Sequence, residues 1–177
     1  MAIVCVLILV LLSPQSNDSP ASVLSSASPS ANLDTSATAD AAGGRWIQPM
    51  PMPLARSGAA VAYDPLNART ILFGGNTVSG LSYEMWTYQA MSNVWREWNT
   101  LVGPSSREGH AMATDLRSGI IVLFGGRTDS GLNNETWVLD PTSLTWTKRE
   151  PIVAPSPRER QEMTYDADAG RIVLFGG

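Results

Sequence analysis

The chain has 177 residues, the length of one domain at about 100–200 residues per domain. Its apolar fraction of 44% allows a packed core, and its formal net charge of −4 argues against a nucleic-acid-binding protein, which needs a basic surface. The single Cys excludes a disulfide framework and a Cys-based zinc site, and the single His excludes a site built from two imidazoles.

The first part of the chain differs in composition from the rest. Residues 1–44 contain no Lys or Arg, whereas all twelve basic residues and all six Trp follow them. Residues 2–12 form an unbroken apolar run, which is too short for a membrane span of about 20 residues but suits a secretory signal peptide. No basic residue precedes this run, so either the signal is weak or the true start lies upstream. We therefore predict a signal-peptide-like segment at 1–14, a secreted or extracytoplasmic protein and no stable membrane span.

A polar tract follows the apolar run. Residues 15–44 consist mainly of Ser, Ala, Pro, Asp and Thr. They offer too little apolar surface to offset the entropy that ordering would cost. The composition predicts a disordered linker, with several small-residue sites at which a signal peptide could be cleaved.

The remainder of the chain repeats with a period of 51 residues. Arginines, aspartates and Phe-Gly-Gly triplets recur in three units, and two tryptophans recur in the first two. A period kept without insertion over this many positions predicts a repeat architecture. The recurring residues are Arg56, Arg107 and Arg158; Asp64, Asp115 and Asp166; Gly74, Gly75, Gly125, Gly126, Gly176 and Gly177; and Trp86, Trp95, Trp137 and Trp146.

Each unit is predicted to contain four short strands. In the second unit these are expected at 110–114, 120–124, 136–139 and 144–147, separated by turns rich in Asp, Gly and Pro. No helical periodicity occurs after residue 44. The fold class is therefore predicted to be all-β.

These features together resemble the kelch repeat. An Arg-x-Gly-His pattern is followed by an apolar run into Gly-Gly, then an acid two residues before a Trp and a second Trp nine residues later. The resemblance extends over residues 45–177 and implies a β-propeller, whose blades are four-stranded sheets around a central channel. The third unit departs from the pattern, because Glu159-Arg160-Gln161 stands in place of the Gly-His segment.

The repeats fill only part of a propeller of about 4–8 blades. Residues 56–106 and 107–157 form two complete units, and 158–177 form the first half of a third. Residues 45–55 contain Trp46 and are expected to hold an orphan strand, of the kind that completes the final blade in kelch-like rings. We expect the N-terminal portion of a larger propeller, whose missing blades belong to the same longer chain or to other chains. The second strand of the last unit would then be an exposed edge.

Recurring residues are expected to serve the blade rather than a ligand. The Gly pairs would permit special backbone angles and close approach, the Trp residues would pack between sheets, and the Asp residues would open turns. The arginines would pair with Glu84, Glu135 or turn carboxylates, or alternatively form an anion-binding channel mouth. His110 is interpreted as structural rather than as a general base, which would need a positioned partner.

Residues that differ between units are the better candidates for ligand contact. Trp98 has Arg149 at the matching position of the next unit. The loops at 76–83 and 127–134 are polar and expected to be adaptable, and the crossovers at 99–106 and 150–157 are expected at the opposite end of the blades. The possible ligand contacts are Trp98, Arg127, Asp129 and Asn133.

The predicted function is binding without catalysis. We expect an exported kelch-repeat interaction module that binds a protein or a carbohydrate through its loops, with no catalytic, cofactor-binding or metal residue in this stretch. The alternative is the N-terminal part of a galactose-oxidase-like copper enzyme. Because Cu(II) favours imidazole ligands and His110 is the single His, that site would lie in the missing blades.

Overall fold

The computed structural model describes residues 38–39, 46–47 and 51–177. The chain divides into two units, Met1–Pro49 and Met50–Gly177. In the first, β1 (Thr38–Ala39) pairs antiparallel with β2 (Trp46–Ile47), so the strand expected at Trp46 is present and its partner is β1. The predicted signal segment and most of the predicted linker lie outside the described residues. No helix in the described part of the chain has the length and apolarity to cross a membrane.

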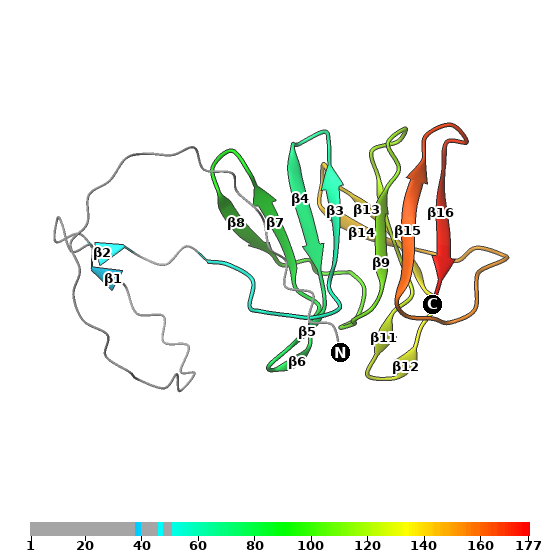
Figure 1. The fold of residues 1–177 in the computed structure, drawn as a ribbon, viewed down its shortest axis with the longest axis horizontal. Coiled ribbons are helices and arrows are strands. Elements are labelled where there is room, and N and C mark those ends of the chain that lie inside the picture. Colours follow the sequence, from blue (N-terminus) through cyan, green and yellow to red (C-terminus); the bar gives the residue numbers. More distant parts are fainter. Residues whose placement is uncertain (1–37, 40–45, 48–50) are drawn as a thin grey trace, which may run out of the picture. The chain divides into compact units, whose positions relative to one another are not determined.

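The compact unit Met50–Gly177 contains two four-stranded antiparallel sheets and a two-stranded one, which lie in succession (Figure 1), and two further small two-stranded hairpins described below. Their strands follow one another in space as they do in sequence. The first sheet has the order β3 (Ala60–Asp64), β4 (Arg69–Phe73), β7 (Met85–Gln89) and β8 (Val94–Trp98). The second has β9 (Ala111–Thr114), β10 (Ile121–Phe124), β13 (Thr136–Asp140) and β14 (Thr145–Arg149), and the third has β15 (Gln161–Asp166) and β16 (Arg171–Gly176).

The arrangement is that of a partial β-propeller, as the resemblance to kelch repeats implied. The first strands of successive sheets, β3, β9 and β15, are neighbours in space, as the inner strands of propeller blades must be. The strands of the second sheet begin and end within two residues of their predicted limits. Each turn after a first strand is closed by its aspartate: Asp64 Oδ1, for example, accepts hydrogen bonds from the backbone N–H of Leu66 and Asn67 at 3.1 and 3.2 Å. The predicted all-β fold class is therefore confirmed.

The core lies between the first and second sheets. Alternate residues of β3, β4, β10 and β13 face this seam, as the period of two in a strand requires. Phe73 and Trp146 meet edge to face, with ring centroids 5.4 Å apart, which is a favoured geometry for an aromatic pair. The buried cluster comprises Ala60, Ala62, Ile71, Phe73 and Met85 from the first sheet and Met112, Ile121, Leu123, Trp137, Leu139, Leu144 and Trp146 from the second.

The phenylalanine at one repeat position is buried in the first two sheets and exposed in the third. Phe73 and Phe124 are 1% and 3% exposed, whereas Phe175 at the same repeat position is 82% exposed. β16 pairs only with β15 among the described strands, so it is an edge, as the sequence predicted. An apolar side chain on such an open sheet face is a surface to which other strands can be recruited.

Two expectations about the connections are wrong. The segments expected to be adaptable loops each contain a small hairpin, β5 (Asn76–Thr77) with β6 (Gly80–Leu81) and β11 (Arg127–Thr128) with β12 (Gly131–Leu132). The crossovers do not project from the opposite end, because in a four-stranded antiparallel sheet the second and fourth strands end on the same side. Accordingly Trp98, the last residue of β8, pairs with Met85, which follows the first hairpin. We call this side, where hairpins and crossovers meet, the hairpin end.

Candidate functional site

The hairpin end is assembled on the repeated Gly-Gly pairs. Gly125 and Gly126 have φ of +70° and +96°, a region that favours glycine. A Cβ on Gly125 would lie 2.8 Å from the carbonyl oxygen of Arg158 and 2.9 Å from Gln161 Nε2, so only glycine fits against the next unit. The N–H of Gly126 donates to the same Arg158 carbonyl at 2.8 Å, and Gly75 donates to Arg107 in the same way. The pairs therefore join each hairpin to the unit that follows it.

The hairpins themselves are held by one repeated side chain. Thr77 Oγ1 donates to the carbonyl of Gly80 at 3.1 Å and accepts from the N–H of Ser79 at 3.1 Å. Thr128 makes the same two bonds in the second unit. Each hairpin thus presents its tip residue on a fixed backbone: Val78, which is 89% exposed, in the first unit and Asp129, also exposed, in the second.

An arginine and a glutamate support each complete unit beneath its hairpin. Arg107, fully buried, places Nη2 2.7 Å from Glu135 Oε2 and donates from Nη1 to the Gly125 carbonyl at 3.0 Å. Trp137 Nε1 donates to the same carboxylate at 3.1 Å, and Lys148 Nζ lies 2.8 Å from its other oxygen. Burial alone would raise the pKa of Glu135, but the hydrogen bonds from Lys148, Arg107 and Trp137 together lower it to about 2.

The same arrangement recurs in the first unit. Arg56 Nη2 lies 2.6 Å from Glu84 Oε2, which also accepts a bond from Trp86 Nε1 at 3.0 Å. Arg158, in the third unit, donates to the carbonyl of Gly176 at 2.8 Å and to Ser156. Of the two roles considered for the arginines, the ion pair with the glutamate before the Trp is the one present at Arg56 and Arg107.

His110 is buried in the seam between the first two sheets, where it is 5% exposed and packs edge-on against Phe73. Neither ring nitrogen has a well-aligned hydrogen-bond partner among the described residues, and the effect of the Phe73 backbone, which would raise the pKa, is smaller than the two effects that lower it. Burial, and then the charge of Arg107, lower the pKa of His110 to about 3. Gln161 occupies the same repeat position and donates to the Phe124 carbonyl at 2.8 Å, so a neutral amide fits this seam.

Replacing His110 with Gln is expected to remove the pH dependence of stability between pH 7 and 5. The imidazole is neutral in the folded chain, whereas the unfolded chain binds a proton below its pKa of 6.5. Stability is therefore full above that value and is lost as the pH falls toward 3. Urea unfolding should show the natural chain losing about 2 kcal/mol from pH 7 to 5, and the variant losing almost none. A flat profile for the natural chain would contradict this assignment.

The predicted contact residues occupy different environments. Trp98 lies on the outermost strand of the first sheet, 41% exposed, and its Nε1 donates to Thr87 Oγ1 at 3.1 Å. Arg127, half exposed, forms a two-point ion pair with Glu159 of the next unit, at 2.7 and 3.1 Å. The amide oxygen of Asn133 accepts the N–H of Glu135 at 2.5 Å, so this side chain is engaged within the structure.

Other exposed residues at the hairpin end were missed from the sequence. Tyr83 is 66% exposed and Leu132 49%, and Arg160 is exposed beside Glu159. For Tyr83 and Arg160 the available signal was the difference between units, since Asn134 stands at the position of Tyr83 and Gly109 at that of Arg160. Leu132 has Leu81 at its matching position, so the repeat gave no such signal for it.

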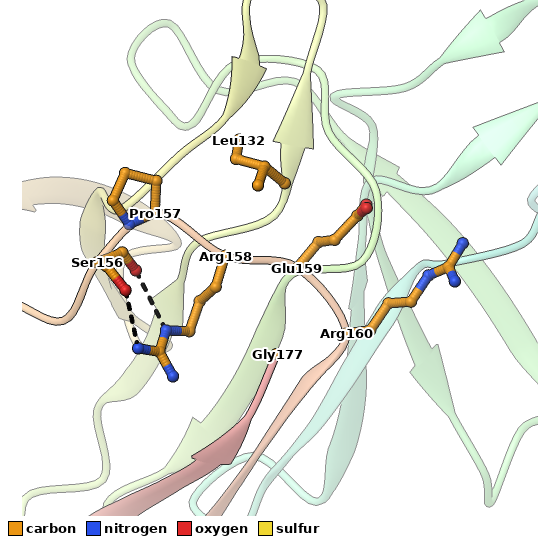
Figure 2. Close-up of a pocket in the computed structure, with 7 residues that line it drawn as sticks. All are labelled: Leu132, Ser156, Pro157, Arg158, Glu159, Arg160 and Gly177. Carbon is orange, nitrogen blue, oxygen red and sulfur yellow. Dashed lines mark hydrogen bonds between the residues drawn. The ribbon is translucent and has the colours of Figure 1, made fainter.

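An open depression of about 550 Å3 lies at the start of the third unit (Figure 2). In the preceding unit the corresponding space is occupied by the β11–β12 hairpin, whose Arg127 exchanges two backbone hydrogen bonds with Glu108. The depression therefore lies at the repeat position that the second unit fills with its own hairpin. Its lining residues are Leu132, Ser156, Pro157, Arg158, Glu159, Arg160 and Gly177.

No three His, Cys, Asp or Glu side chains gather into a metal-binding group within the described residues. The copper-enzyme alternative concerned blades beyond these repeats, so it stays a prediction.

Comparison with known proteins agrees with the architecture. The family profile of the KLHDC2/KLHL20/DRC7 Kelch-repeats domain matches residues 39–177. Similar proteins include dynein regulatory complex subunit 7 of Chlamydomonas reinhardtii, 41% identical over 76 residues, which are 42% of this chain and 6% of that protein. Adagio-like protein 1 of Oryza sativa subsp. japonica is 31% identical over 113 residues, 62% of this chain and 18% of that protein. The tRNA wybutosine-synthesizing protein 4 of Emericella nidulans is 31% identical over 117 residues, 60% of this chain and 11% of that protein.

The chain thus spans less than a fifth of the length of these relatives. The profile covers most of the chain, and both the repeat and the stacked sheets agree with it. The protein belongs to the kelch-repeat family, whose domains are protein–protein interaction modules.

Proposed function

We propose that this protein is an exported module that binds a protein partner through its hairpin end. The observation that carries the proposal is the presentation of different side chains on one repeated, rigid frame. The two Thr-anchored hairpins have equivalent backbones, yet Val78 of one corresponds to Asp129 of the other. Residues that change while the scaffold stays constant are the expected carriers of recognition.

The exposed side chains at this end are of the kinds that protein interfaces use. Tyr83 and Val78 form the apolar contribution of the first unit, and the half-exposed Arg127, whose charge Glu159 balances, adds a planar polar group in the second. Tyr and Arg are enriched at interfaces because they combine a large contact area with hydrogen bonding. The name of dynein regulatory complex subunit 7, a relative, describes a subunit of a complex, which supports a partner of protein rather than carbohydrate nature.

Binding should be lost when the hairpin end is altered and retained when the opposite end is altered. The test uses the full chain, immobilised and exposed to an extract of its host, with bound proteins quantified. Replacing Tyr83 with Ala together with Val78 with Ser should reduce the retained partner about tenfold, the effect of removing an interface anchor. Met91, 94% exposed in the turn between β7 and β8 at the opposite end, provides the control variant Met91→Ser. Equal losses from both variants would contradict the proposal.

A carbohydrate ligand is tested on the same surface. The natural chain and the Tyr83→Ala, Val78→Ser variant are compared on an array of glycans. If glycans bind to the natural chain but not to the variant, and no protein is retained from the extract, the ligand is a carbohydrate and the proposal of a protein partner is wrong.

Export rests on the apolar run at 2–12 followed by the small-residue tract. The protein expressed in its host should appear outside the cytoplasm with a new N-terminus between about residues 20 and 40. N-terminal sequencing checks this, and a cytoplasmic product that retains Met1 would disprove export.

A further inference from the structure

Residues 134–136 read Asn-Glu-Thr, which is the acceptor triplet for N-glycosylation in the secretory pathway. They follow the β11–β12 hairpin at the hairpin end, and Thr136 is the first residue of β13. The chain has one other triplet of this kind, at 17–19. Comparison of the units shows whether the fold itself requires Asn134 and Thr136, because residues of the scaffold recur from unit to unit.

The two residues that define the triplet are those that change between units. Asn134 stands at the position of Tyr83, whereas the middle residue, Glu135, repeats the glutamate of the first unit. Thr136 stands at the position of Met85, which is 1% exposed and belongs to the buried cluster. A threonine there buries less apolar surface than the methionine and carries a hydroxyl that the first unit does without. The scaffold therefore accounts for the glutamate but for neither Asn134 nor Thr136.

The Asn134 side chain is exposed, and its Nδ2 donates to the carbonyl of Pro155 at 3.3 Å. The exposure belongs to the repeat position, since Tyr83, which is followed by a complete unit, is 66% exposed at the same place. An asparagine amide carries two hydrogens. A sugar can replace one of them while the other keeps the bond to Pro155.

The order of the chain also leaves the triplet accessible before folding. β13 pairs with β14, and Asn134 with Pro155, and both of these partners follow the triplet in the sequence. A chain that enters the secretory pathway from its N-terminus presents the triplet before the sheet can be completed. Asn134 is thus accessible to a transferase before folding, and its side chain stays at the surface afterwards.

We propose that Asn134 carries an N-linked oligosaccharide. This inference rests on the proposed export and goes beyond the proposed binding. The donor is an oligosaccharide linked to a lipid through pyrophosphate. The Nδ2 of Asn134 forms a bond to the anomeric carbon of the sugar, and the bond from that carbon to the pyrophosphate oxygen breaks. The lipid pyrophosphate leaves, and Nδ2 loses one proton to solvent.

The oligosaccharide would stand in the second unit where Tyr83 stands in the first. Such a bulky, hydrated group excludes a protein surface from its immediate surroundings. A partner at the hairpin end would therefore be directed to the first unit, which presents Val78 and Tyr83.

The test uses the full chain expressed in its host and recovered from outside the cytoplasm. It is treated with a peptide N-glycosidase in 18O-labelled water, which converts a glycosylated asparagine to a labelled aspartate, and its peptides are analysed by mass spectrometry. We expect the label at residue 134, together with a loss of mass of the whole protein. Thr136→Val, which removes the hydroxyl and keeps the shape, should abolish both, whereas Thr136→Ser and Asn17→Gln should keep both.

The outcomes separate this inference from the proposed function. An exported chain without the label would overturn the inference and leave the export and the binding of a partner in place. Label at residue 134 that persists in Thr136→Val would also overturn it, since deamidation of the asparagine does not depend on the triplet. A cytoplasmic chain that retains Met1 would disprove export and this modification together.

Discussion

Replacing Glu135 with Ala is expected to lower the free energy of unfolding by about 3–5 kcal/mol, the cost of leaving a buried charge without its partner. Arg107 is fully buried and its positive charge is balanced by Glu135 at 2.7 Å. The same carboxylate also accepts a bond from Trp137 and pairs with Lys148, so its removal leaves several groups unsatisfied. Urea unfolding at pH 7 measures the effect through the midpoint at constant slope.

The control for this prediction is Glu159→Ala. Glu159 forms an ion pair of similar length with Arg127, but that arginine is half exposed. Water replaces the lost partner there, so a loss of less than about 1 kcal/mol is expected. Similar losses from the two variants would show that burial of Arg107 does not determine the effect.

Gly125→Ala is expected to destabilise the chain by about 2–4 kcal/mol. Part of this is the left-handed conformation, at about 1–2 kcal/mol for a residue with a Cβ. The rest is overpacking, because the new methyl group would lie 2.8 Å from a carbonyl of the next unit, and such forced shifts cost about 1–3 kcal/mol. The contact is with backbone, which cannot move aside as the end of a flexible side chain could.

Gly176 provides a matched comparison for Gly125. It occupies the same repeat position with φ of +79°, but nothing lies within 4 Å of a Cβ placed there. Gly176→Ala should therefore show only the conformational part, about 1 kcal/mol. Equal losses at the two positions, measured by urea unfolding, would show that close approach between units contributes nothing.

Much of the fold could be predicted because its signals are local and repeated. The strand limits follow from apolar, β-branched runs between turn residues, and the aspartate that closes each turn acts within three residues of itself. The Gly-Gly pairs were also interpretable, since recurrence at every unit indicates a demand of the scaffold rather than of a ligand. The candidate site was predictable only as far as its loops, because no local pattern distinguishes an adaptable loop from a hairpin held by Thr77 or Thr128.

The sequence by itself determined the period, the strands and the membership of each residue in a unit. The tertiary structure alone decided which neighbours each unit places across its seams. Only packing shows that Arg127 pairs with Glu159, 32 residues away, and that Arg160 repeats the conformation of Gly58 and Gly109. Only packing distinguishes the buried Phe73 from the exposed Phe175, although both end the same apolar run. The physical reason is that the repeat determines the strands and side chains of each sheet. The exposed fraction, the charge balance and the pKa of a side chain depend instead on the residues of the neighbouring sheet that pack against it.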